Sequence, residues 1–119
     1  MKSSAQLKIL MVGNDPALAY LIGRYAARSG YELASLAGIP QAGEVNALKP
    51  AALIFTSVES LEASQTLVAG LTGSDIPVLV CTSIGEEARG RELGADDCLI
   101  HPLTYDGFHS ALAARPPKK

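Results

Sequence analysis

The amino-acid sequence predicts a single α/β domain in which helices cover both faces of a parallel β-sheet. Short apolar runs of strand length alternate along the chain with longer segments that carry apolar residues at helical spacing. The chain has 119 residues, of which 48% are hydrophobic, so it is long enough for one domain with its own core. Parallel strands need crossover connections, and a helix after each strand supplies them.

The first strand and helix have the clearest signals. Leu7 to Val12 is a nearly unbroken apolar run, typical of a strand buried on both faces, and turn residues follow it. Asp15 is placed to cap a helix whose first residue is Pro16, and Gly30 ends that helix. One apolar helix face is expected to hold Leu18, Leu21, Ile22 and Tyr25.

The middle of the chain continues the alternation with weaker signals. Tyr31 to Leu36 is expected to form the second strand, and Gln41 to Leu48 a short helix that Pro50 closes. Ala51 to Thr56 is expected to form the third strand. The next helix is expected to end near Gly70 to Gly73, with an apolar stripe of Leu61, Leu67, Val68 and Leu71.

The last third predicts two more strands and two more helices. Ile76 to Thr82 is the most strand-like run, and Ser83 with Glu86 forms a capping box for a helix that reaches Leu93 and Gly94. Cys98 to Ile100 is expected to form a short fifth strand before Pro102. A final helix from Tyr105 to Ala114 ends before two prolines, so we expect a domain of residues 1–114 and a tail or linker of residues 115–119.

Composition and charge argue against several classes of protein. The net charge is −2 and the only adjacent basic pair is Lys118–Lys119, so direct nucleic-acid binding is not expected. The apolar run at Leu7 to Val12 is too short for a signal peptide or a membrane span. Cys81 and Cys98 lie in apolar runs and predict buried, reduced thiols, which indicates a cytoplasmic protein.

Polar residues follow the strands at the positions where a parallel sheet gathers its binding groups. In a doubly wound sheet these groups meet at the carboxyl ends of the strands, close to the point where the strand order reverses. The sequence therefore predicts one crevice that contains Gly13, Asn14 and Asp15 after the first strand, Thr56 after the third, Thr82 and Ser83 after the fourth, and His101 after the fifth.

Three stretches resemble the receiver domains of bacterial two-component response regulators, and the resemblance extends from Leu7 to about Leu112. Ile9 to Pro16 resembles the first strand and acidic turn of that family, Pro77 to Ser83 its fourth strand with the switch hydroxyl at Thr82, and Gly94 to Leu103 its fifth strand. The resemblance implies a flavodoxin-like doubly wound fold with five parallel strands in the order 2-1-3-4-5. It also implies a cis peptide bond before Pro102.

The residues that perform chemistry in that family are mostly replaced here. Gly13 and Asn14 stand where the family has its acidic pair, Thr56 where it has the phosphoacceptor aspartate, and His101 where it has a lysine. Phosphoryl transfer needs a carboxylate nucleophile, a magnesium ion and a cation on the phosphoryl oxygens. We therefore expect no phosphotransfer, no enzyme activity, no cofactor and no tight metal site, and we expect Asp15 to act as a helix cap.

The resulting hypothesis is a phosphorylation-independent pseudo-receiver in a signalling or transcriptional regulator, which binds a protein partner or forms a dimer. The resemblance implies an interaction face of Glu86, Glu87, Arg89, Arg91, Cys98, Tyr105 and Phe108, to which the two aromatic residues add exposed area. One alternative is an atypical receiver switched by a ligand, pH or phosphorylation of another residue type. A second is a small enzyme or nucleotide-binding protein on the same fold.

Overall fold

A computed structural model describes residues 7–36, 38–71 and 73–113 of the chain. Its five strands form one parallel sheet in the order β2-β1-β3-β4-β5, as the resemblance to receiver domains implied. The strands are β1 (Leu7–Val12), β2 (Tyr31–Leu36), β3 (Ala52–Phe55), β4 (Val78–Thr82) and β5 (Asp97–Ile100). Val12 lies beside both Leu36 and Phe55, so the carboxyl ends of the first three strands are level.

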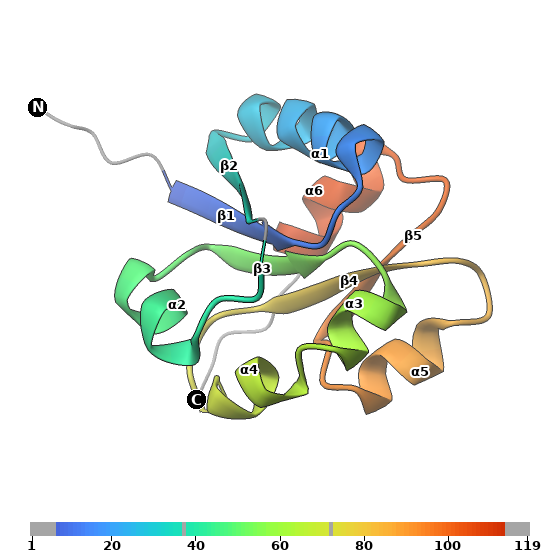
Figure 1. Ribbon diagram of the computed structural model, residues 1–119. Coiled ribbons are helices and arrows are strands. Elements are labelled where there is room, and N and C mark those ends of the chain that lie inside the picture. The colour runs from blue at the N-terminus through green and yellow to red at the C-terminus, as the bar shows by residue number, and fades with distance from the viewer. Residues whose placement is uncertain (1–6, 37, 72, 114–119) are drawn as a thin grey trace, which may run out of the picture.

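Helices cover both faces of this sheet (Figure 1). α1 (Pro16–Arg28) and α6 (Tyr105–Ala113) lie on one face. The other face carries α2 (Ala42–Leu48), α3 (Val58–Glu62), α4 (Gln65–Gly70) and α5 (Glu87–Glu92). This arrangement is the flavodoxin-like fold that the sequence predicted, and it places the ends of the strands between the two helical layers.

Two hydrophobic cores result from the alternation of side chains along the strands. Ile9 and Met11 of β1 pack on the α1 and α6 side, whereas Leu10 and Val12 pack on the opposite side. Every residue of β3 and β4 is buried, because these strands have neighbours on both edges and helices on both faces. Phe108 of α6 is fully buried in the first of the two cores.

The single helix expected over Leu61 to Leu71 is two short helices, α3 and α4. At the break, two side chains donate hydrogen bonds to main-chain carbonyl groups. Ser64 Oγ donates to the Ser60 carbonyl at 2.9 Å, and Gln65 Nε2 donates to the Leu61 carbonyl at 3.1 Å. Such local bonds compete with the helical pattern. The sequence prediction of one continuous helix was wrong here because it counted apolar spacing and not these competing donors.

The helix before β5 begins later than its sequence signal suggested. Glu86 Oε1 accepts a hydrogen bond from Ser83 N at 2.8 Å, which is half of the expected capping box. Ser83 to Gly85 nevertheless form a turn, and the helix starts only at Glu87. The tail of residues 115–119 and the expected helix end at Ala114 lie outside the described residues. In the described ranges, every helix is too short or too polar to cross a lipid bilayer.

Candidate functional site

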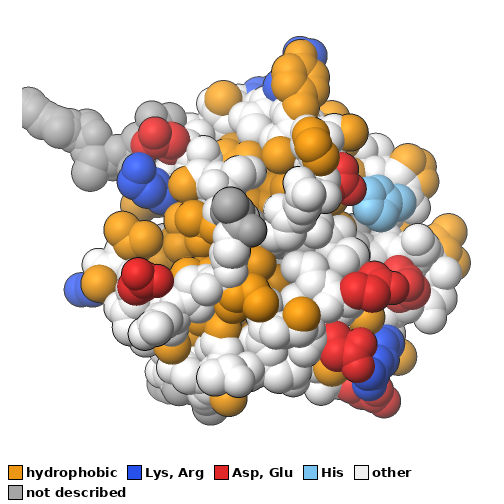
Figure 2. All heavy atoms as spheres, in the orientation of Figure 1, with side chains coloured by type: hydrophobic (Ala, Val, Ile, Leu, Met, Phe, Trp, Pro, Cys, Tyr) orange, Lys and Arg blue, Asp and Glu red, His pale blue; other side chains and the backbone are white. Residues whose placement is uncertain are grey.

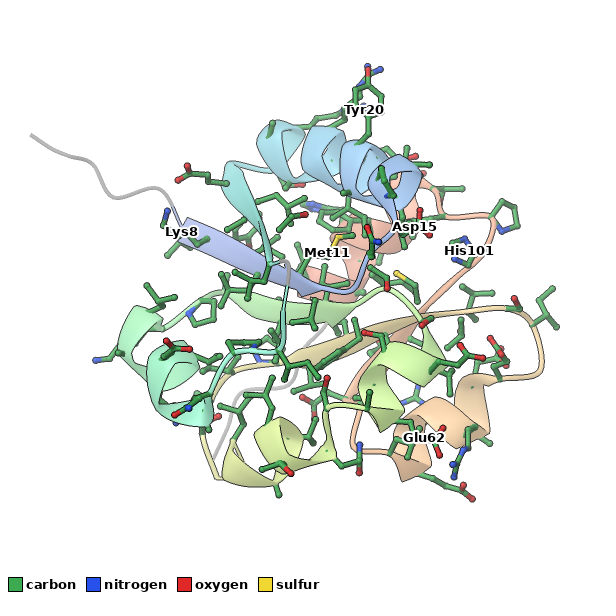
Figure 3. The ribbon with its side chains drawn as sticks, viewed as in Figure 1. Lys8, Met11, Asp15, Tyr20, Glu62 and His101 are labelled. Carbon is green, nitrogen blue, oxygen red and sulfur yellow. The ribbon has the colours of Figure 1, made fainter. Side chains whose placement is uncertain are left out.

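The groups expected in one crevice do lie at one end of the sheet. Figure 3 shows Asp15 and His101 at the end where β1 turns into α1, with Lys8 at the opposite end of β1. Backbone hydrogen bonds connect the strand ends there, since Thr56 N donates to the Val12 carbonyl at 3.0 Å and His101 N donates to the Thr82 carbonyl at 2.8 Å. The expected residues therefore lie at the same end of the parallel sheet, but their side chains do not form a single cluster.

Gly13 and Thr56 pack directly against each other. Gly13 has a φ of +129°, a conformation that side-chain-bearing residues rarely adopt. A Cβ atom at position 13 would overlap Thr56 Oγ1 and lie 2.8 Å from Thr56 Cγ2 and 2.9 Å from Thr56 Cβ. Thr56 itself is only 9% exposed. The threonine side chain thus fills the volume that an acidic side chain at position 13 would need.

Asn14 and Asp15 are exposed, and Asp15 caps α1. Asp15 Oδ1 accepts a hydrogen bond from Leu18 N at 3.1 Å, and Pro16 begins the helix, as the sequence predicted. Both residues line a cavity of about 280 Å³ together with Ser35 and Leu36 of β2. Thr56, Thr82 and His101 do not line this cavity, which opens on the β2 side of β1.

The thiol of Cys81 lies in the core beneath this end of the sheet. It is 2% exposed, and burial raises its pKa from the usual 9.0 to about 12, with the negative charge of Asp15 adding to the shift. The thiol consequently stays protonated at neutral pH and is a poor nucleophile or metal ligand. The prediction of a buried cysteine is confirmed at this position, where the thiol is free.

Thr82 lies against α5. It is 1% exposed, and its hydroxyl makes no hydrogen bond of ordinary geometry with the described residues, although the Cys98 thiol lies beside it. A Cβ atom on Gly90 would lie 3.4 Å from Cys98 Sγ and 3.7 Å from Thr82 Cγ2. Gly90 therefore lets α5 approach the two strands closely, and the sequence reasoning did not identify that role.

Cys98 is only half-buried, so the prediction of a buried thiol was wrong at this position, because β5 is an edge strand of the sheet. Its Sγ donates to the Glu87 carbonyl at 3.7 Å. Burial is the largest influence and raises the pKa of Cys98; Arg91 lowers it, and Asp97 raises it again. Because β5 carries this small residue beside Thr82, the hydroxyl has no aromatic ring on the next strand to act on.

His101 is exposed and precedes a cis peptide bond to Pro102. The cis bond agrees with the resemblance to receiver domains. Among the residues that the structure describes, no three His, Cys, Asp or Glu side chains gather into a group that could hold a metal ion. Only one of the residues expected in the crevice carries a carboxylate, namely Asp15, and one of its oxygens already accepts the helix-cap hydrogen bond.

The charged residues of the expected interaction face are largely engaged within the chain. Arg89 pairs with Glu62 at 3.0 Å and with Glu92 at 3.6 Å, and Arg91 pairs with Asp97 at 3.1 Å. Glu86 accepts from Ser83 N, as described above. Glu87 accepts from Gly85 N at 2.8 Å, and main-chain hydrogen bonds lower its pKa. Figure 2 shows acidic and basic side chains gathered over α5, and these contacts hold the β4–α5 loop and α5 in place.

The two aromatic residues do not extend this face. Phe108 has no exposed surface and packs in the core under α1, so the expectation that it adds exposed aromatic area was wrong. The helical spacing turns it toward the sheet, where a large apolar side chain gains most. Tyr105 is half-buried and faces α1, where its ring lies 5.7 Å from that of Tyr25 in an edge-to-face arrangement.

Two exposed isoleucines near α5 were missed in the sequence. Ile84 in the β4–α5 turn is 82% exposed, and Ile100 at the end of β5 is 40% exposed. Thr82, the last residue of β4, pairs with Ile100, the last residue of β5, so Ile100 and the turn that carries Ile84 lie at adjacent strand ends. An isoleucine between Ser83 and Gly85, in a turn that otherwise calls for polar residues, was the available signal.

Neither a protein-family model nor a curated protein sequence matches the chain. Solved structures match most of its length. The N-terminal domain of the nisin resistance regulator NsrR has a TM-score of 0.70 and 21% identity, over 92% of this chain and 97% of that one. Chemotaxis protein CheY4 of Vibrio cholerae has a TM-score of 0.69 and 19% identity, over 92% and 98%.

A protein from Burkholderia pseudomallei described as pilus assembly-related has a similar TM-score of 0.68, with 19% identity over 96% of this chain and 93% of that one. The chain thus has the fold of response-regulator receiver domains, and the same fold occurs in a protein with a different described role. Likeness at these identities defines the fold, and the function has to be argued from the site.

Proposed function

We propose that this chain is a receiver-type signalling module that binds another protein, or a second copy of itself, without accepting a phosphoryl group. The observation that carries the proposal is the packing of Thr56 against Gly13. The acceptor position holds a hydroxyl in place of a carboxylate, and this side chain occupies the room that an acidic partner at position 13 would require. The fold is that of a receiver domain, but the space at the strand ends that would hold acidic side chains is filled by Thr56.

Physical chemistry gives this pocket little capacity for phosphoryl transfer. A threonine hydroxyl needs an adjacent general base to attack phosphorus, and magnesium needs several oxygen ligands in octahedral geometry. His101 offers an imidazole ring where receiver domains have a lysine, whose ammonium group is a compact charge for the phosphoryl oxygens. A binding module in the cytoplasm, with no enzyme activity and no direct contact to nucleic acid, is the function we infer.

We place the interaction face over α5 and β5. Ile84 and Ile100 supply apolar area there, and the ion-paired Arg89 and Arg91 form a polar rim beside it. Apolar anchors inside a polar rim are the usual composition of a protein interface. Because the rim charges are already paired within the chain, a partner would gain mainly from covering the two isoleucines.

Phosphorylation independence is tested by adding magnesium with beryllofluoride, a mimic of the phosphoryl group, to isotope-labelled protein. We expect no saturable change in the amide chemical shifts of Thr56 and His101, and no rise in the melting temperature. A receiver domain with an intact acidic pocket serves as the positive control. Saturable shifts around Thr56 would contradict the proposal and favour an atypical receiver that still responds to a ligand.

The interaction face is tested by Ile84→Glu, with Ile39→Glu as a matched control. Ile39 is also exposed, at 51%, but it lies in the segment before α2 and far from β5 in the strand order. Sedimentation equilibrium over a range of concentrations should show a dimer that Ile84→Glu dissociates and Ile39→Glu leaves unchanged. A monomer at every concentration would reject self-association, and a dimer insensitive to Ile84→Glu would reject this face.

A further inference from the structure

The outer edge of β2 carries main-chain groups that have no partner within the described residues. β2 is the last strand on its side of the sheet, and all 6 of its residues pair with β1 in unbroken register. In such a strand every second residue directs its N–H and C=O groups away from the neighbouring strand. No side chain in the part of the chain that the structure describes hydrogen-bonds to the main chain of Tyr31–Leu36. These outward groups are therefore open to another strand.

β5, at the opposite edge of the sheet, is closed to such pairing. It has 4 residues, and side chains already bond to the main chain there. Cys98 N donates to Asp97 Oδ1 at 2.8 Å, and Arg91 donates to the Asp96 carbonyl, just before the strand, at 3.1 Å. Short length and charged side chains are common ways in which proteins protect a sheet edge from other chains.

β2 lacks the features that protect an edge strand. It contains no proline and no lysine, and its register with β1 has no bulge. Glu32 is its one charged residue, and Lys8 of β1 pairs with it at 3.4 Å. Its apolar side chains are only half-buried: Leu33 packs on the side of α1, and Ala34 and Leu36 on the side of α2. A strand added at this edge would cover both faces further.

A cavity of about 280 Å³ lies against the carboxyl end of this edge. It is lined by the β1–α1 turn and by Ser35 and Leu36, the last two residues of β2. Asp15 is the one charged residue of the lining, and it forms no ion pair with a described residue. The amino end of α1 contributes about half a positive charge, so the full charge of the carboxylate leaves the cavity acidic. A lysine or arginine side chain suits this cavity best.

We propose that β2 and this cavity together bind an extended segment of another protein, which adds to the sheet as a further strand. The segment carries apolar side chains at alternate positions, which cover the half-buried faces of β2. Antiparallel pairing is slightly more stable per residue than parallel pairing, and it brings the amino-terminal end of the segment to the cavity. The basic residue that pairs with Asp15 therefore stands at the start of the segment.

The main chain and the charges identify the kind of occupant. A helix uses its main-chain groups in its own hydrogen bonds, so only an extended segment can satisfy the outward groups of β2. β2 itself contains no lysine or arginine, so a second copy of this edge would leave the cavity without a basic group. The site lies at the other edge of the sheet from α5 and β5, and it does not depend on the interaction face proposed above.

The test titrates isotope-labelled protein with a synthetic peptide in which a lysine is followed by alternating valine and threonine. We expect amide shifts in β2 and the β1–α1 turn, and slower hydrogen exchange at alternate residues of Tyr31–Leu36. Two N-methylated peptides test strand pairing directly. Methyl groups on the amides that face β2 should abolish binding, whereas methyl groups on the other alternate set should leave it unchanged.

The role of the cavity is tested by Asp15→Asn, which removes the charge but keeps a side chain able to cap α1. It should weaken binding of the lysine peptide by about two- to fivefold, the range of one exposed ion pair, and leave a peptide that starts with norleucine unaffected. Asp75→Asn is the matched control, because Asp75 is an exposed carboxylate in the turn before β4, at the opposite end of the sheet. It should change neither affinity.

Four results would overturn the proposal. They are no binding at millimolar peptide, shifts that map away from β2, equal binding of the two N-methylated peptides, and an equal effect of Asp15→Asn on the lysine and norleucine peptides. Protection of β2 amides that rises with protein concentration in the absence of peptide would also contradict it, because a second copy of the chain would then occupy the edge.

Discussion

Replacing Gly13 by alanine tests whether the pocket is closed by the packing of Gly13 against Thr56. Two costs add at this position. The φ of +129° is unfavourable for any residue with a Cβ atom, at about 1–3 kcal/mol. Overlap of the new methyl group with the Thr56 side chain adds a similar amount, about 1–3 kcal/mol. The lower entropy of the unfolded alanine chain returns about 0.4–1 kcal/mol.

We therefore expect Gly13→Ala to lower the free energy of unfolding by about 1–5 kcal/mol. Equilibrium unfolding in urea, followed by circular dichroism, measures that change. Gly30→Ala is the matched control, because Gly30 also has a positive φ, +88°, but a Cβ atom there would meet nothing within 4 Å. The control isolates the backbone cost, and we expect it to be clearly the smaller of the two.

The double substitution separates packing from backbone strain. Thr56→Ala removes Oγ1 and Cγ2, the two side-chain atoms beyond Cβ that a methyl group at position 13 would meet. In the Gly13→Ala background it should restore part of the lost stability, with a coupling of about 1–3 kcal/mol. If the two substitutions are additive, or if Gly13→Ala costs no more than Gly30→Ala, then Thr56 does not close the pocket.

Three further predictions concern the core. Gly90→Ala should destabilise the fold, because the new Cβ atom would lie 2.9 Å from Val80 Cγ1. A Cβ atom at Gly43 in α2 would meet no atom within 4 Å, so Gly43→Ala should stabilise the fold by about 0.5–1 kcal/mol. Urea unfolding compares the two variants. Phe108→Ala should cost about 3–5 kcal/mol by the same measurement, and a cost below 1 kcal/mol would mean that the ring is not buried. Between pH 9 and 12, the unfolded chain loses the Cys81 proton while the folded chain keeps it. The free energy of unfolding should therefore fall by about 1.4 kcal/mol per pH unit in this range. Cys81→Ala should remove this contribution to the slope.

The sequence predicted the arrangement of the fold because the strand signals and the topology rules agree. Apolar runs such as Leu7 to Val12 indicate buried strands, and their alternation with helices predicts a parallel sheet, whereas the order of the strands came from the resemblance to receiver domains. The break between α3 and α4 was not predictable in the same way. It depends on Ser64 and Gln65 donating to particular carbonyl groups, which apolar spacing does not encode.

The candidate site was predicted as a set of positions and not as a geometry. Strand ends could be read from the sequence, so Gly13, Thr56 and His101 were placed at the correct edge of the sheet. The direction of each side chain depends on packing between elements distant in the sequence. Thr82 therefore turned out to face α5, and Phe108 the core, because in both cases burial decided the orientation.

The two cores explain how the residues at the strand ends can vary while the fold is kept. The buried residues of β1, β3 and β4 precede the strand ends, and they pack against helices on both sides without contributing to the pocket. Gly13 and Thr56 lie just beyond these strands, where a pair of residues can be exchanged if their combined volume still fits. A single change to a larger residue at either position would then disturb the packing, whereas a matched change of both would be tolerated.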